Sequence, residues 1–413
     1  MISLFLIYTI LLKKHKTLFA EKKKMFVFIG IISLLFAITL PFTTSDIFYY
    51  MGTGWLEAHY SENPYYTSVK DIKEINPEDE LLNRTGVWEG QTVVYGPLWA
   101  FICNVLSSFS FGNVTLGLYV YKLAAVLIHL GTAILIYKIT RNSLFPLMYG
   151  LNPFILFEGI TNVHNDLYLV FFTVLALYFL LNKKNIFGTI LALALATTIK
   201  YVSILLLPFV LIYYFREKTI GKRIGFCILC GGIFLAIILG IYAFYLQDIQ
   251  IFLAMFLQQS KLRESIIFLL FMLAQKYPTI FTIQIFNIVK YLLFILFACF
   301  YVITIVKLLF KKKIIWPQTV RKYHKVLLLF LFTVITNLCP WYLMWLYPCI
   351  MWLKGKSIKI ILYLSFAYEF CTLYNFGMHS ESYKIGILYI PTMIIIVYAL
   401  SYKKKDRAER YLN

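Results

Sequence analysis

The feature that most constrains this chain is a repeated alternation of long apolar runs with short clusters of lysine and arginine. A helix that spans a lipid bilayer needs about 20 mostly apolar residues, and runs approaching this length recur along most of the sequence. Hydrophobic residues make up 61% of the 413 residues and charged residues 14%, whereas soluble domains have roughly 45–50% and 25%. A water-soluble enzyme and a disordered chain are therefore both excluded.

The basic residues are concentrated between the apolar runs, and this arrangement explains the net charge of +20. Lysine and arginine gather in the cytoplasmic loops of membrane proteins, which is the positive-inside rule. The clusters therefore mark the cytoplasmic loops, and we expect no nucleic acid among the partners. They lie at residues 13–24, 183–184, 216–223, 307–325, 354–359 and 403–410.

The alternation predicts an all-α polytopic membrane protein with about 11 to 12 transmembrane helices in one integral membrane domain, residues 1–413. The first apolar run, residues 1–12, is short, and the sequence leaves open whether it crosses the membrane. The predicted spans include residues 114–139, 144–160, 201–215, 281–309, 326–338, 341–353, 360–375 and 385–402.

Two longer segments interrupt the alternation, and both are predicted to lie outside the cytoplasm. The first, residues 43–113, carries nine of the 19 acidic residues against three basic ones, and a loop poor in lysine and arginine belongs on the outer side. Within it, the apolar stretch 97–109 is short for a span and is predicted to be a helix along the membrane surface. The second outer segment is residues 247–279.

Ionisable residues at membrane depth are costly and are therefore candidate functional residues. In the predicted topology they gather on the outer side, where Asp46, the turn His164–Asn165–Asp166 and Lys200 lie. One carboxylate with nearby cations suits sugar transfer from a lipid phosphate, because a phosphate leaving group needs little protonation and one general base suffices. Glycoside hydrolysis requires an acid as well.

Each candidate also has a purely structural interpretation. Asp46 and Asp166 suit the start of a helix, Lys200 suits a side chain that reaches to the interface, and His164 suits a solvated turn. The aromatic residues of the first loop suit either a sugar-binding surface or the aromatic belt found at membrane interfaces. They are Tyr49, Tyr50, Trp55, Tyr60, Tyr65, Tyr66, Trp88, Tyr95 and Trp99.

Four groups of short motifs follow one another along the chain. They are Ser45-Asp46-Ile47-Phe48-Tyr49-Tyr50 with Asn63-Pro64-Tyr65 and Tyr95-Gly96-Pro97-Leu98; Asn152-Pro153 with Glu158 and Asn162-Val163-His164-Asn165-Asp166; Lys200-Tyr201 with Pro208; and Pro340-Trp341-Tyr342-Leu343-Met344-Trp345-Leu346-Tyr347-Pro348. In these motifs the chain resembles the membrane-embedded GT-C glycosyltransferases. Within them it is most similar to the bacterial polyprenol-phosphomannose-dependent mannosyltransferases and to the mannosyltransferases of GPI-anchor synthesis.

The resemblance implies a multi-pass enzyme of the bacterial cell membrane whose active site faces outside the cytoplasm. It implies an inverting hexosyltransferase that moves mannose from a polyprenyl-phosphate-linked donor to a glycan or glycolipid acceptor. Asp46 matches the catalytic base, and Lys200 is assigned to the donor phosphate. Residues predicted to contact the acceptor or the rest of the donor are His164, Asn165, Asp166, Tyr201, Tyr49, Tyr65, Trp341 and Tyr342.

Metal binding is not predicted. Some relatives carry an Asp-x-Asp pair where Asp46 stands, but this chain has Phe48 at the second position. A divalent metal therefore lacks the second carboxylate of that pair, and we expect no cofactor.

Two other functions fit a polytopic membrane protein. A transporter or flippase for a lipid-linked sugar requires polar groups at mid-depth in several spans, and the clearest such residues here are His129 and Glu369. A non-catalytic scaffold of an envelope-assembly complex is the third hypothesis. It predicts that Asp46 tolerates substitution.

Overall fold

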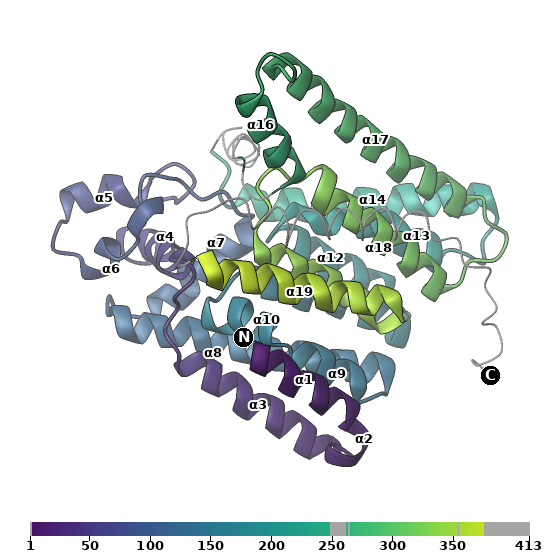
Figure 1. The fold of residues 1–413 in the computed structure, drawn as a ribbon, viewed down its shortest axis with the longest axis horizontal. Coiled ribbons are helices and arrows are strands. Elements are labelled where there is room, and N and C mark those ends of the chain that lie inside the picture. The colour runs from purple at the N-terminus through teal and green to yellow at the C-terminus, as the bar shows by residue number, and fades with distance from the viewer. Residues whose placement is uncertain (1, 248–261, 263–264, 354, 376–413) are drawn as a thin grey trace.

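The computed structural model describes residues 2–247, 262, 265–353 and 355–375 (Figure 1). This part of the chain is built of helices and turns and contains no β-strand. The elements are α1 (Ile2–Lys13), α2 (His15–Leu18), α3 (Lys22–Ile38), α4 (Asp46–Tyr60), α5 (Val69–Ile75), α6 (Glu80–Asn83), η1 (Gly86–Trp88), α7 (Pro97–Ser108), α8 (Val114–Thr140), α9 (Leu144–Gly150), α10 (Pro153–Ile155), η2 (Leu156–Thr161), α11 (Asp166–Tyr178), η3 (Phe179–Lys183), α12 (Ile186–Thr197), η4 (Tyr201–Leu206), α13 (Leu207–Tyr214), α14 (Ile220–Ala243), α16 (Ile266–Lys276), α17 (Ile283–Leu309), α18 (Trp316–Thr333), η6 (Pro340–Trp352) and α19 (Lys356–Asn375).

In the described part of the chain, four helical segments are long and apolar enough to cross a membrane by themselves. They are α8, the continuous segment formed by α11 and η3, α14 and α17. Helices α14 and α17 bury few of their side chains, and their outer faces expose isoleucine and leucine. A soluble monomer rarely exposes an apolar surface of this extent. The prediction of an all-α polytopic membrane protein is confirmed.

Several predicted spans are not single α-helices. Residues 144–160 are divided into α9, α10 and the π-helical η2, because Pro153 lacks an N–H group to continue the hydrogen bonds of α9. The Asn152 side chain instead caps the next turn by accepting a hydrogen bond from the Phe154 N–H group at 3.0 Å. The predicted span 341–353 instead corresponds to the 3-10 helix η6, which contains Pro348 and ends at Trp352.

Two other predicted spans have different boundaries from those expected. Residues 201–215 begin as the 3-10 turn η4 before α13 starts at Leu207. Helix α18 begins at Trp316 and ends at Thr333, whereas the span was expected at 326–338. Its first half buries Val320 and Tyr323 while basic residues occupy the rest of its surface, a pattern that a search for uniformly apolar runs overlooks.

The basic clusters that lie within the described residues gather at one end of the helical bundle. There Asn182 donates a hydrogen bond to the Lys138 carbonyl, Tyr214 donates to the Lys184 carbonyl, and Arg223 donates to the Leu309 carbonyl. The first outer segment, residues 43–113, covers the opposite end, at the left of Figure 1, where α4, α5, α6 and α7 lie.

Helix α4 is the central element of that covered end. Side chains on nearly all sides of it are buried, and α7 packs against it so closely that a Cβ atom at Gly54 would lie 2.3 Å from the Cys103 carbonyl oxygen. The stretch predicted at 97–109 is a helix, α7, and its position relative to the membrane surface stays a prediction.

Two predictions fall largely outside the described residues. The last predicted span, 385–402, is one of them. Of the second outer segment, 247–279, the structure describes mainly α16 and the turn that follows it.

The contact at Gly54 leads to a stability prediction. We expect Gly54→Ala to lower the free energy of unfolding by about 1–3 kcal/mol, because α4 and α7 must separate to admit the methyl group. Gly231→Ala is the matched control, since it also lies within a helix and its added Cβ meets nothing within 4 Å. Thermal unfolding of both variants in detergent measures the difference, and equal midpoints would contradict the close packing.

Candidate functional site

A cavity of about 850 Å³ lies at the end of the bundle covered by the first outer segment. Its walls come from three stretches of chain, residues 41–49, 87–95 and 337–342, together with Leu262 and Thr372. Aromatic rings form much of the lining, and Asp46 is the single acidic residue among the described residues that line it. The principal side chains are Phe42, Phe48, Tyr49, Trp88, Tyr95, Trp341 and Tyr342.

Asp46 is the first residue of α4 and is only 9% exposed. The Thr44 hydroxyl accepts a hydrogen bond from the Asp46 N–H group at 3.1 Å, and the Trp88 indole nitrogen donates to Asp46 Oδ1 at 3.2 Å. Burial raises the pKa of Tyr95 well above its ordinary value, and the nearby Asp46 carboxylate adds to this effect. The Tyr95 phenol therefore stays neutral beside the acidic group.

His164 is fully buried directly behind Asp46. Its Nδ1 atom lies 3.6 Å from Asp46 Oδ2, and its Nε2 atom lies 3.1 Å from Glu158 Oε2. The imidazole stacks on the Trp341 ring with 3.6 Å between ring centroids and 16° between ring planes. Among the described residues, neither ring nitrogen meets a partner with hydrogen-bond geometry.

The backbone around His164 is strained. Val163 has φ +56°, although it is β-branched and buried, and this left-handed conformation costs about 1–2 kcal/mol. The residues just before it form the π-helical η2, which contains Glu158. Both features cluster at functional sites, where the surrounding packing maintains the strain.

A buried lysine fixes the two chain segments that lead into this site. Lys122 of α8 donates hydrogen bonds to the Thr39 carbonyl oxygen at 2.7 Å and to the Thr161 carbonyl oxygen at 2.8 Å. Close by, Asn162 Nδ2 donates to both the Thr43 hydroxyl and the Glu158 carboxylate. These contacts tie the end of α3 to the end of η2.

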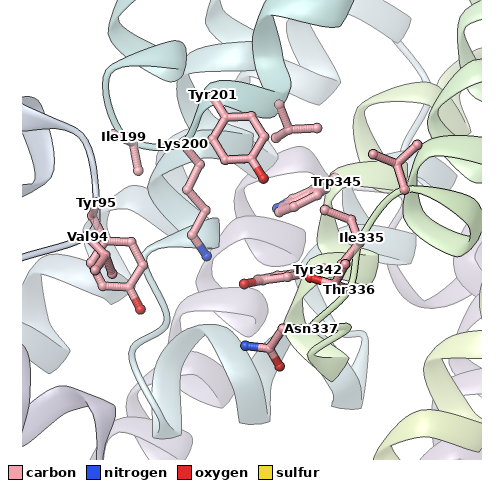
Figure 2. Close-up of a pocket in the computed structure, with 12 residues that line it drawn as sticks. Val94, Tyr95, Ile199, Lys200, Tyr201, Ile335, Thr336, Asn337, Tyr342 and Trp345 are labelled. Carbon is pink, nitrogen blue, oxygen red and sulfur yellow. The ribbon is translucent and has the colours of Figure 1, made fainter. Parts of the chain in front are cut away.

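Lys200 lies at a second, smaller cavity that adjoins the first. Figure 2 shows its side chain between Tyr95 and Tyr342, and these two residues, with Asn337, line both cavities. The Lys200 ammonium is 4.7 Å from the Tyr342 ring centroid and forms a 2.7 Å ion pair with Asp166 Oδ2. The other Asp166 oxygen accepts a hydrogen bond from the Trp345 indole.

Gly96 permits the close contact between the first outer segment and the turn that carries Lys200. The Gly96 N–H group donates to the Ile199 carbonyl at 3.0 Å, and a Cβ atom at Gly96 would lie 2.1 Å from the Thr198 carbonyl oxygen. Only glycine allows the first outer segment to approach the turn that carries Lys200 so closely.

The structure distributes the remaining predicted site residues among different positions. Tyr49 lines the larger cavity and donates to the Thr92 carbonyl at 2.9 Å. Tyr201 lines the smaller one and is 38% exposed. Tyr65 lines neither cavity, since it packs in a separate cluster and donates to the Tyr95 carbonyl at 2.7 Å. Asn165 is buried next to Asp166, and its amide atoms have no hydrogen-bond partner among the described residues.

Four residues at the site were not singled out as site residues from the sequence. Trp88 and Tyr95 are two of many first-loop aromatics, and the sequence offers no signal that separates them from the others. Asn337 has no signal at all, because it lies between apolar runs. The sequence does offer a signal for Glu158, because it is an acidic residue within an apolar run. In the structure Glu158 contacts His164. In the described part of the chain, no group of three or more His, Cys, Asp or Glu side chains is arranged to hold a metal ion.

The fold and the site define a class: an integral membrane protein with one buried carboxylate facing an aromatic-lined cavity at one end of its helical bundle. Residues 1–216 match the family model described as "Alpha-(1->6)-mannopyranosyltransferase, N-terminal domain", and the chain belongs to this family. The matched part contains Asp46, His164 and Lys200. The resemblance to bacterial mannosyltransferases inferred from the sequence is confirmed.

A curated relative gives the same result. Over 188 residues the chain is 28% identical to "Alpha-(1->6)-mannopyranosyltransferase A" of Corynebacterium glutamicum. This alignment covers 44% of the chain and 36% of the relative, so the chain matches little more than a third of the relative's length. No solved structure matches the chain significantly.

The buried pair of Lys200 and Asp166 leads to a second prediction. Lys200→Met leaves the Asp166 carboxylate buried without its cation, and we expect a loss of about 3–5 kcal/mol in the free energy of unfolding. Lys24→Met is the control, because Lys24 and its partner Glu21 are both exposed and their ion pair contributes less than about 1 kcal/mol. The double variant Lys200→Met/Asp166→Asn should recover part of the loss, and chemical unfolding of all variants tests this coupling.

Proposed function

We propose that this chain is a membrane mannosyltransferase that uses a polyprenyl-phosphate-mannose donor and Asp46 as general base. The observation that carries the proposal is the Asp46 carboxylate, which is the one acidic group on the described wall of an 850 Å³ aromatic-lined cavity. Membership of a family described by mannosyl transfer supports the choice of sugar. The relative's name supports an α-(1→6) linkage.

The proposed reaction is a single displacement. Asp46 removes the proton from the acceptor hydroxyl, whose oxygen attacks C1 of mannose. The bond between C1 and the phosphate oxygen breaks, and its electron pair leaves with polyprenyl phosphate. The configuration at C1 inverts because attack and departure occur on opposite faces. A second carboxyl group is not required, since phosphate leaves without prior protonation.

The cavity walls have suitable properties for both substrates. Aromatic rings such as Phe42, Phe48 and Trp341 offer flat apolar faces to a sugar ring and a prenyl chain. The Lys200 ammonium lies between Tyr95 and Tyr342, where its charge favours a phosphate placed at Asn337. Asp166 holds the ammonium in position. The end of the bundle that carries Asp46 faces outside the cytoplasm, since the basic clusters of the described residues lie at the other end.

Substitution of Asp46 tests the role of the base. Asp46→Asn keeps the shape of the side chain but cannot accept the hydroxyl proton, and we expect transfer to fall by at least about 100-fold. The assay follows labelled mannose from polyprenyl-phosphate-mannose to octyl α-mannoside, used as the acceptor probe. Glu74→Gln is the control, because Glu74 lies in the same segment on the exposed surface and pairs only loosely with Lys70 at 3.7 Å. Wild-type transfer by Asp46→Asn would overturn the mechanism.

The transport hypothesis is tested with sealed vesicles that contain the purified protein and labelled polyprenyl-phosphate-mannose. An enzyme produces a labelled mannoside that depends on the acceptor probe, and Asp46→Asn abolishes this product. A flippase moves the labelled lipid between leaflets without forming a product. Translocation without transfer would therefore exclude the mannosyltransferase proposal.

A further inference from the structure

His164 was predicted to contact substrate, and the structure places its side chain away from the walls of both cavities. The side chain is fully buried and does not line either cavity. Asp46 on one side and Trp341 on one face separate it from the larger cavity. The cavity-lining residues that His164 contacts are therefore Asp46 and Trp341, and of these only Asp46 carries an ionisable group.

The imidazole lies between two carboxylates from different parts of the chain. Nδ1 faces Asp46 Oδ2 of α4 at 3.6 Å, and Nε2 faces Glu158 Oε2 of η2 at 3.1 Å. Asn162 Nδ2 also donates to Glu158 Oε2 at 3.0 Å, which fixes the carboxylate that faces the ring. A carboxylate that orients an imidazole, which in turn contacts the reacting group, is the general arrangement of a positioned catalytic group.

We infer that His164 is a positioning residue for Asp46, and that Glu158 holds the imidazole in place for this role. The inference rests on the proposed function of Asp46 as base. When substrate occupies the cavity, the 3.6 Å contact shortens to a hydrogen bond, since catalytic contacts are often long before substrate binds. The imidazole N–H then stabilises the ionised Asp46 carboxylate and aims its other oxygen at the acceptor hydroxyl. Asp46 takes the proton, and His164 keeps its own.

Other charged groups surround this arrangement. Glu369 of α19 interacts with Glu158, Lys122 of α8 donates to the Thr161 carbonyl beside η2, and the Lys200–Asp166 pair follows on the next turn. The Trp88 indole donates to Asp46 from the first outer segment. Among these groups, only His164 and Trp88 bring a ring nitrogen toward Asp46 itself.

The test is the pH dependence of mannosyl transfer by the full-length protein, with polyprenyl-phosphate-mannose and octyl α-mannoside as substrates. For His164→Gln we expect kcat to fall about 10- to 100-fold while KM for the acceptor changes by less than about twofold. The acid limb of the kcat profile, which reports the substrate complex, should move to higher pH by about one unit, because Asp46 loses the donor that favours its ionised form there.

Two further variants test whether Glu158 affects Asp46 through the His164 imidazole. Glu158→Gln keeps an acceptor oxygen for Nε2, so kcat should fall less than in His164→Gln. The double variant should be no slower than His164→Gln alone, because Glu158 acts through the imidazole. This non-additivity would not arise if each residue only stabilised the fold.

His129→Gln is the matched control. His129 is also fully buried, stacks on Tyr149 and contacts the Gly150 carbonyl, but no described contact links it to Asp46. We expect its kcat and pH profile to match the wild type. Unfolding midpoints of all variants are measured in parallel, and if His164→Gln does not fold, the fall in kcat at constant KM in Glu158→Gln decides the question.

The outcomes separate the two proposals. If Asp46→Asn retains transfer, the proposed function fails. If Asp46→Asn is inactive while His164→Gln keeps wild-type kcat and an unchanged acid limb, the positioning role is wrong and the proposed function stands. A rise in KM without a change in kcat would also overturn the positioning role, since it would assign His164 to substrate binding.

Discussion

The hydrogen bonds from the Lys122 ammonium to the carbonyl oxygens of Thr39 and Thr161 are the contacts on which the site depends. Both acceptors lie where a helical segment ends, and a cation is favourable next to such unpaired carbonyl groups. One buried side chain thereby joins the end of α3 to the end of η2. Asp46 follows a few residues after the first of these ends and His164 a few residues after the second, so this contact holds together the two chain segments that lead to them.

The same end of the bundle collects polar groups that would be costly against lipid. Asp166 pairs with Lys200 and Trp345, while Asp46 receives a hydrogen bond from Trp88 and faces His164. Each group is stabilised by a partner from a distant part of the sequence. The polar partners that make burial tolerable are also the groups that surround the cavity, so stability and the candidate chemistry depend on the same contacts.

The sequence predicted the apolar helices well where an apolar run was long and uninterrupted, as in α8 and α17. The predicted spans were wrong where proline interrupts the hydrogen bonds of the helical backbone. Pro153 and Asn152 divide one expected span into three elements, and η6 takes 3-10 geometry around Pro348. Hydropathy averages over a window and does not detect which N–H groups are missing. Among site residues, Tyr65 stays a predicted substrate contact, and the structure places it outside both cavities, where it donates to the Tyr95 carbonyl. An aromatic ring carries no sequence signal of the direction it faces.

The sequence by itself determined that the chain is a polytopic membrane protein, and it identified Asp46, His164 and Lys200 as unusual polar residues beside apolar runs. Hydropathy and charge are local properties, so the order of residues is sufficient to read them. Only the tertiary structure decided that Asp46 faces the cavity, that His164 lies buried behind it, and that Lys200 is paired with Asp166. These residues are far apart along the chain, and their distances depend on how the helices that carry them pack together.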